Sequence, residues 1–186
     1  MGTHHQYHPV SKLLHWTMGI IWIGVWCAGF LAVHFREQLN PHHGLSLWHK
    51  AIAITLVFLV VVRVFWRIVT PPPPLPDSMT PRMQQAAFAG HLAIYALALV
   101  ALPMSGWALS SVAGKPVMML GLVEIPPYLP ESPAVVETVR AIHTWLSWLC
   151  AAMVAGHVVL AFKHHLVDRD GVLQGMLPAR RPDARR

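Results

Sequence analysis

Long apolar stretches alternate with short polar segments along the chain, and four of these stretches are long enough to cross a membrane. The first runs from Leu13 to Phe35 and contains no Asp, Glu, Lys or Arg. At about 1.5 Å per residue, a helix of that length spans a hydrocarbon core of roughly 30 Å. Transmembrane helices are predicted at residues 13–35, 47–68, 84–111 and 140–164. The pattern therefore predicts an all-α fold, an integral membrane four-helix bundle that forms a single membrane domain over residues 1–186.

Prolines mark the connections between these helices. The consecutive prolines Pro71–Pro74 end the second helix and begin a proline-rich loop over residues 71–82. Pro103 lies inside the third apolar stretch, where we expect it to bend the helix. The segment 112–139 is again rich in proline, and we interpret it as an interfacial loop or a short amphipathic piece.

The distribution of basic residues predicts the orientation of the bundle. One side of the membrane, which includes the tail 165–186, carries more Lys and Arg than the other side, whose basic residues are Arg36, Lys50, Lys115 and Arg140. By the positive-inside rule, both termini, the 71–82 loop and the 165–186 tail are cytoplasmic, and the 112–139 loop is periplasmic. Because the basic residues gather around the apolar stretches, the net charge of +6 indicates contact with membrane lipid and no nucleic-acid partner.

The amino-acid composition excludes several classes of protein. Charged residues make up 12% of the chain, about half the share of an ordinary soluble domain, which argues against a large soluble enzyme. The two cysteines form neither a CxxC nor a CxxCH motif, so a zinc ribbon and a covalently attached c-type haem are both disfavoured. The 13 histidines outnumber the 8 acidic residues, and several lie inside the apolar stretches, where an ionisable side chain is expensive.

The histidines inside the predicted helices fall at two depths. His143 lies toward the outer end of the fourth helix and His157 toward its inner end. Their spacing leaves them within about 40° of one helical face and about 21 Å apart along the axis. His49 lies at the outer depth, and His15 and His91 lie at the inner depth. We call these sets the outer level (His49, His143) and the inner level (His15, His91, His157).

Paired histidines at one depth suit a planar macrocycle. A haem takes two axial donors from opposite sides, and a neutral imidazole supplies a strong nitrogen donor. His49 and His143 form the outer pair, while His157 is paired with either His15 or His91. Ligation by two histidines leaves no open position on the iron, which favours electron transfer over oxygen binding. The alternatives are histidines that only form hydrogen bonds within the bundle, and a haem-free transition-metal transporter or sensor, for which intramembrane carboxylates and thiolate motifs are lacking.

Other polar residues near the two levels have more than one interpretation. His164 shares a face with His157 nearer the cytoplasm, which suits a proton or quinone route as well as a solvated interfacial histidine. Arg63 and Arg67 suit contacts to haem propionates as well as anchoring at the lipid headgroups. At the outer level, Lys50 follows His49 in the sequence, and Arg140 lies one turn before His143. These two residues, with Lys115 and Arg36, either steer a small anion toward the outer level or only meet headgroups and solvent.

Several short motifs together resemble one known family. They are His15-Trp16, Trp48-His49, Gly90–Tyr95, Ala101–Trp107, the pair His143 and His157, Lys163–His165 and Asp168–Gly171. The set is similar to the bacterial cytochrome b561 family over nearly the whole chain, and it is specific as a set although each motif alone is not.

The resemblance implies a four-helix protein of the bacterial inner membrane that holds two non-covalent haems b. It implies His15 and His157 as ligands of the inner haem iron and His49 and His143 as ligands of the outer one, and it leaves His91 without an assigned role. It also implies electron transfer between the quinone pool and a periplasmic donor or acceptor, either a redox protein or superoxide, because one branch of the family oxidises superoxide and reduces ubiquinone. We expect the ubiquinone-like substrate near the inner level, beside Arg67, His91 and His164. The alternative function is a haem-bearing anchor subunit that relays electrons for a separate dehydrogenase or hydrogenase.

Overall fold

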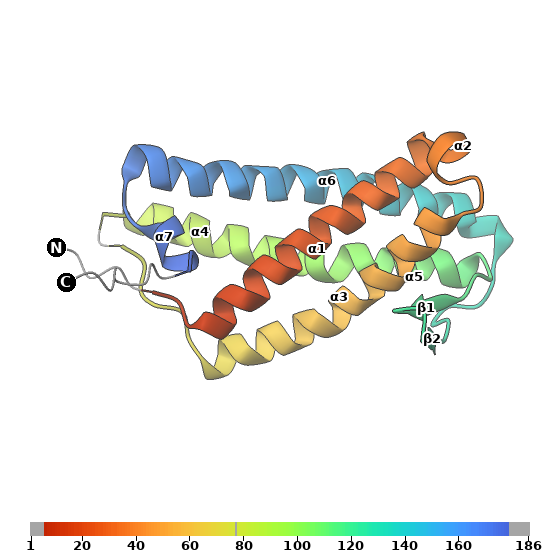
Figure 1. Cartoon of the computed structure of the whole chain (residues 1–186), viewed down its shortest axis with the longest axis horizontal. Helices are drawn as coiled ribbons and strands as arrows, with labels where there is room; N and C mark the ends of the chain where they lie inside the picture. The colour runs from red at the N-terminus through yellow and green to blue at the C-terminus, as the bar shows by residue number, and fades with distance from the viewer. Residues whose placement is uncertain (1–5, 77, 179–186) are drawn as a thin grey trace, which may run out of the picture.

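The computed structural model describes residues 6–76 and 78–178 and consists mainly of long helices that run side by side (Figure 1). The main elements are α1 (Pro9–His34), α3 (Gly44–Val69), α4 (Pro81–Ala93), the π-helical η1 (Ile94–Ala101), α5 (Leu102–Val112) and α6 (Val136–Lys163). The segment from α4 to α5 forms one continuous rod, so the bundle has four long helices, each apolar and long enough to cross a membrane. The predicted four-helix membrane bundle is confirmed. The tail arginines that contributed to the predicted orientation lie outside the described residues.

The four long helices begin three to four residues earlier than the apolar stretches predict, and in α1 and α4 a capping side chain supports the added first turn. His8 caps α1 by accepting a hydrogen bond from the Val10 backbone N–H at 3.2 Å. Thr80 caps α4 in the same way, with its hydroxyl 3.3 Å from the Met83 backbone nitrogen. Both helices have proline at the first position, where the missing N–H costs nothing.

The disturbance expected at Pro103 takes the form of a π-helical segment. The backbone N–H of Leu102, the residue before Pro103, donates to the Leu97 carbonyl five residues back. Proline has no N–H to donate and its ring clashes with the carbonyl four residues earlier, so the preceding turns widen. The widened segment η1 lies at the centre of the bundle and separates the two ends of the third rod.

The segment between α5 and α6 contains a short β-hairpin that the sequence analysis did not predict. Its strands are β1 (Val117–Met119) and β2 (Val123–Ile125), and they pair antiparallel with Val117 opposite Ile125. Leu120 and Gly121 make the turn with positive φ angles of 51° and 72°. A 3-10 turn, η2 (Pro133–Val135), then leads into α6. The hairpin packs on α3, which buries the Val117 side chain.

The remaining short elements close the two ends of the bundle. They are α2 (Arg36–Leu39) at one end, and η3 (His164–Asp168) and α7 (Val172–Met176) at the other. The described N-terminal and C-terminal segments meet at this second end, where the Trp16 indole N–H donates to the Met176 carbonyl at 2.9 Å (Figure 1). The buried core lies midway along the bundle and is formed by Met18, Trp22, Leu56, Val60, Ala98, Leu99, Leu102 and Cys150. Many other large apolar side chains face outward, as expected for a surface covered by lipid.

Candidate functional site

At the outer level, His49 of α3 and His143 of α6 face each other. Their ring centroids are 6.2 Å apart and their planes are nearly perpendicular, at 82°. The Nδ1 of His49 lies 2.8 Å from the Val25 carbonyl oxygen, which can only accept a hydrogen bond. The Nδ1 of His143 lies 2.8 Å from the Ser105 hydroxyl, whose own proton is donated to the Leu102 carbonyl. Both rings therefore carry their proton on Nδ1, and their Nε2 atoms are left as lone-pair donors.

Three histidines meet at the inner level. His15 of α1 lies 6.1 Å from His157 of α6 between ring centroids, and His91 of α4 lies 5.3 Å from the same His157 ring. The Nδ1 of His91 donates to the Ala87 carbonyl at 2.7 Å. The Nδ1 of His15 instead lies 3.1 Å from the Arg63 guanidinium, which has only donors, so Nδ1 is the acceptor. With Arg63 in this position, the His15 proton sits on Nε2. A neutral His15 ring could hold a metal through Nε2 only if its proton were on Nδ1 and the Arg63 guanidinium lay away from that atom.

The spacing of the rings tests whether these residues fit haem. Two imidazole–metal bonds of about 2 Å, with about 1 Å from each nitrogen to its ring centre, place the centroids roughly 6 Å apart. The outer pair, at 6.2 Å, and the pair His15 and His157, at 6.1 Å, match this separation, whereas His91 and His157, at 5.3 Å, are closer. By ring separation alone, each level fits ligation of one haem by two histidines. At the inner level, the ring separation favours His15 as the partner of His157. The proton on Nδ1 favours His91 instead, because it leaves the Nε2 of His91 free to bind a metal.

Glycines make room for both outer rings. A Cβ atom on Gly29 of α1 would lie 2.8 Å from the Cε1 and Nδ1 atoms of His49, and one on Gly106 of α5 would lie 3.1 Å from Cε1 of His143. The sequence did not predict a role at the site for either glycine. Gly29 follows His15 by the same 14-residue spacing that relates His143 to His157, so helical periodicity places Gly29 and His15 near one face and could have indicated it.

The predicted outer cations are partly engaged by other groups. The Lys50 ammonium donates to the Pro116 carbonyl at 3.1 Å, which ties the outer end of α3 to the hairpin segment. The Arg140 guanidinium lies 3.2 Å from the Glu137 carboxylate one turn earlier on α6. Both members of this ion pair are exposed, so water screens the attraction. The steering of an anion by Lys50 and Arg140 stays a prediction.

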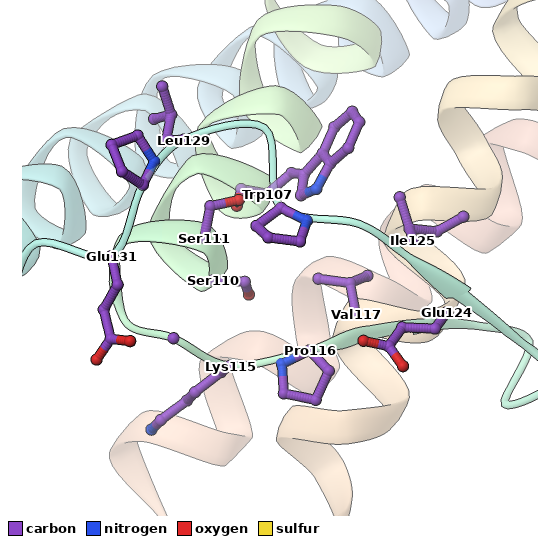
Figure 2. Close-up of a pocket in the computed structure, with 13 residues that line it drawn as sticks. Trp107, Ser110, Ser111, Lys115, Pro116, Val117, Glu124, Ile125, Leu129 and Glu131 are labelled. Atoms are coloured by element: carbon purple, nitrogen blue, oxygen red, sulfur yellow. The ribbon is translucent and has the colours of Figure 1, made fainter.

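A cavity of about 320 Å³ lies between the outer end of α5 and the hairpin (Figure 2). Its lining includes the indole of Trp107, the buried hydroxyls of Ser110 and Ser111, and the three charged residues Lys115, Glu124 and Glu131. The loop that closes it also carries Tyr128, whose hydroxyl donates to the Met104 carbonyl. Burial raises the pKa of the Tyr128 phenol, which keeps it a neutral donor. Because the charged residues of the lining have both signs, the cavity is not a purely cationic surface.

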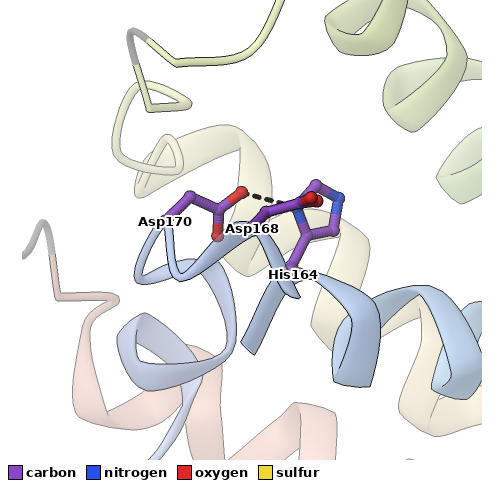
Figure 3. A group of neighbouring side chains, drawn as sticks. All are labelled: His164, Asp168 and Asp170. Atoms are coloured by element: carbon purple, nitrogen blue, oxygen red, sulfur yellow. Dashed lines mark hydrogen bonds and ion pairs between the residues drawn. The ribbon is translucent and has the colours of Figure 1, made fainter. Parts of the chain in front are cut away.

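At the opposite end of the bundle, His164 is held by two carboxylates (Figure 3). Its Nδ1 lies 2.5 Å from Asp170 and 3.2 Å from Asp168. The Asp170 side chain is only 2% exposed, and its second oxygen accepts from the Val172 backbone N–H. Lys163 neutralises Asp168 at 2.6 Å, so the group is a closed network of charges and not an open cation site. The carboxylates hold the ring by Nδ1, and its other nitrogen points away from them.

The two residues predicted for a quinone or proton route are not joined directly. His91 is exposed on α4 and contacts His157, whereas His164 begins η3 after the end of α6. Within residues 6–76 and 78–178, no hydrogen bond or ring contact links the two histidines. The predicted route through both of them stays a prediction.

Comparison with known proteins identifies the family. The family model described as Prokaryotic cytochrome b561 matches residues 6–179. The chain belongs to the prokaryotic cytochrome b561 family. It is 37% identical over 177 residues to cytochrome b561 homolog 2 of Escherichia coli, covering 95% of this chain and 93% of that protein. It is 25% identical over 178 residues to the probable superoxide oxidase CybB of Yersinia pestis, and the match covers 96% of this chain and 99% of that protein. This cytochrome b561 is therefore a multi-pass bacterial membrane protein that transfers electrons through b-type haem.

Proposed function

We propose that this cytochrome b561 carries two haems b, one at each level, and passes electrons across the bacterial inner membrane between the quinone pool and a periplasmic donor or acceptor. The observation that carries the proposal is the pair of ring separations, 6.1 Å for His15 and His157 and 6.2 Å for His49 and His143. Since α6 contributes one histidine to each pair, a single helix holds both centres in a fixed relation.

Bound haem would supply a one-electron couple at each level, and the protein residues hold and insulate it. The Val25 carbonyl and the Ser105 hydroxyl hold the outer rings by Nδ1 and leave Nε2 free to bind a metal. Trp22 and Cys150 belong to the apolar core between the levels, which keeps water away from the centre of the bundle. The Trp22 indole N–H donates to the Ala98 carbonyl in η1 at 3.0 Å, so this core contains a satisfied polar contact.

The sides of the membrane follow from the positive-inside rule, which supports a cytoplasmic inner level. Ubiquinone then reacts near this level, where His164 is a candidate proton donor or acceptor. The contact of its Nδ1 with Asp170 supports this role, because a ring fixed at one nitrogen can exchange a proton at the other. His91 is a second candidate, because it lies beside His157.

Superoxide is the donor that we favour on the periplasmic side. The proposal draws support from the similarity to a probable superoxide oxidase over nearly the whole chain, and from the position of Lys50 directly after His49. In this form the protein is a superoxide:ubiquinone oxidoreductase: two superoxide anions each lose one electron to the outer level, and ubiquinone gains two electrons and two protons at the inner level.

The central test is a reduced-minus-oxidised optical spectrum of the purified protein together with its haem-to-chain ratio. We expect two low-spin haems per chain, and reduced protein that is reoxidised by a ubiquinone analogue. A ratio of one or fewer haems would contradict the two-level arrangement. A ratio of two with no response to quinone would leave the haem proposal standing and contradict the quinone step.

A further inference from the structure

The cavity between α5 and the hairpin is lined by a buried hydroxyl that has no partner. Ser110 is only 6% exposed, and within the part of the chain that the structure describes its hydroxyl forms no hydrogen bond (Figure 2). The neighbouring Ser111 differs, because its hydroxyl donates to the Trp107 carbonyl and accepts from the Tyr128 backbone N–H. A buried polar group without a partner costs free energy, which a hydrogen bond to a ligand would offset. The Ser110 hydroxyl therefore indicates a polar ligand.

A carboxylate lies at the end of α5 beside this hydroxyl. The Glu131 carboxylate packs on Gly114, where a Cβ would lie 2.8 Å from its Cδ and Oε2 atoms. The C-terminal end of a helix carries partial negative charge, so a carboxylate placed there is unfavourable unless a cation neutralises it. Among the described residues, neither Glu131 nor Glu124, the other carboxylate of the lining, forms an ion pair. Both are exposed and accessible to a ligand, and this part of the cavity favours a positively charged group.

A group of the opposite charge also lines the cavity. The Lys115 ammonium forms no hydrogen bond or ion pair within the described segments. A ligand with one positive and one negative group therefore complements this lining better than a ligand with a single charge. The volume of about 320 Å³ lies at the lower end of the range of small-molecule pockets, about 300–1,000 Å³, and suits a compact polar group.

The hairpin places this cavity at the depth of the lipid headgroups. The Leu120 backbone N–H donates to the carbonyl of Ala51, about two turns inside the membrane-spanning helix α3. The hairpin also exposes large apolar side chains, namely Leu120, Leu122 at 81% and Val123. Neighbouring exposed apolar side chains indicate contact with a membrane or another molecule. Because the hairpin lies alongside the end of a membrane-spanning helix, lipid is the molecule that these side chains meet.

We propose that the cavity binds the headgroup of a zwitterionic phospholipid that has a primary ammonium group, as in phosphatidylethanolamine. The ammonium donates to the Ser110 hydroxyl and the Glu131 carboxylate, and Lys115 binds the phosphate. A primary ammonium has three N–H donors, whereas the trimethylated ammonium of phosphatidylcholine has none, so the Ser110 hydroxyl distinguishes the two headgroups. The bound lipid joins α5 to the hairpin, and this role does not depend on the haem proposal.

The test compares lipids that share their acyl chains and differ only in the headgroup. The full-length, haem-loaded protein is delipidated in detergent and titrated with phosphatidylethanolamine, phosphatidylcholine or phosphatidylglycerol, and native mass spectrometry measures the affinity of the first bound lipid. We expect phosphatidylethanolamine to bind about tenfold more tightly than either of the others, because only its ammonium forms charge-assisted hydrogen bonds. The comparison cancels the binding of lipids that coat the bundle without regard to headgroup.

Two variants remove the proposed contacts. Relative to phosphatidylcholine, Ser110→Ala should reduce the preference for phosphatidylethanolamine about fivefold, and Glu131→Gln about tenfold. Glu37→Gln is the matched control, since Glu37 is an exposed carboxylate on α2, at the same end of the bundle and outside the cavity lining (Figure 1). Because the Ser110 hydroxyl has no partner in the protein, Ser110→Ala should leave the melting temperature of the delipidated protein unchanged, which separates a lost ligand contact from structural damage.

Three results would overturn the proposal. Phosphatidylglycerol that binds as tightly as phosphatidylethanolamine would show that the ammonium has no part in recognition. A preference for phosphatidylethanolamine that persists in both Ser110→Ala and Glu131→Gln would place the lipid elsewhere on the bundle. Soluble phosphoethanolamine that binds as tightly as the lipid, and is weakened by the same two substitutions, would show that the cavity takes a free zwitterion and not a membrane lipid.

Discussion

The contact between Gly29 and His49 gives a sharp test of the outer level. In Gly29→Ala, the new Cβ would lie 2.8 Å from two atoms of the His49 ring, whereas ordinary contacts begin at 3.4 Å. The ring must therefore move by about 0.6 Å or more, and it is also fixed by the 2.8 Å hydrogen bond to the Val25 carbonyl. Any displacement of the ring changes the direction of its Nε2.

The size of the effect follows from two terms. Inserting a methyl group into a packed site costs about 1–3 kcal/mol. Loss of the hydrogen bond to Val25 would add about 1 kcal/mol. Since about 1.4 kcal/mol is a factor of ten, the first term alone weakens outer haem binding by about five- to 150-fold. The methyl group itself adds helix propensity, so the loss should appear in haem content and not in helix content.

The assay compares Gly29→Ala with two other glycine variants. Gly24→Ala is the matched control, because it lies on the same helix and its Cβ would meet nothing within 4 Å. Gly106→Ala has a milder contact with His143, at 3.1 Å, and should fall between the two. For each purified variant we would measure the haem-to-chain ratio and the rate at which haem is lost to a scavenging protein. The expected order of haem loss is Gly29→Ala, then Gly106→Ala, then Gly24→Ala.

One outcome would refute this reasoning. If Gly29→Ala kept two haems with unchanged spectra and the same rate of haem loss as Gly24→Ala, the His49 ring would not be confined as the structure shows. His49 would then be a poor candidate for an outer ligand. A loss of both haems in Gly24→Ala as well would instead indicate a general loss of helix packing in α1.

Three further predictions concern the ligands, the quinone step and the donor. His49→Ala and His157→Ala should each lose mainly one haem, as measured by the haem-to-chain ratio, and two unchanged haems in either variant would show that residue is not a ligand. Asp170→Asn should slow reoxidation by a ubiquinone analogue several-fold, because His164 loses a charged partner. Glu137→Gln is the control, and equal reoxidation rates in the two variants would contradict a role for His164. The rate of reduction by superoxide should fall with rising salt, and this salt dependence should be weaker in Lys50→Ala. Because Arg140 is paired with Glu137, Arg140→Ala should change the salt dependence less than Lys50→Ala does.

Much of the fold could be predicted because the membrane restricts the choices. A segment without water must satisfy its own backbone hydrogen bonds, so a charge-free stretch such as Leu13 to Phe35 can hardly be anything but a helix. The segment after α5 has no such restriction. Its hairpin depends on the positive φ angles at Leu120 and Gly121 and on packing against α3, and only the glycine is visible as a turn signal.

The two histidine levels could also be predicted, since helical periodicity relates His143 to His157 on one helix. Their immediate partners could not. The Val25 carbonyl lies 24 residues from His49, and Arg63 lies 48 residues from His15. A backbone carbonyl has no sequence signature at all, because every residue has one. The choice between His15 and His91 likewise depends on ring separations that only the packed bundle defines.

The histidine rings of the two levels differ in the group that contacts their Nδ1 atom. The proposed ligands are alike at the two levels, because each pair has one histidine from α6 and one from another helix. The difference lies in the second contact of each ring, a neutral oxygen at His49 and His143 and a guanidinium at His15. Such contacts change how strongly a ring donates to iron, and so which oxidation state it stabilises. Iron ligation by a neutral His15 ring through Nε2 would therefore require its proton to move to Nδ1 and the Arg63 guanidinium to move away from that atom, a rearrangement that His49 and His143 do not need.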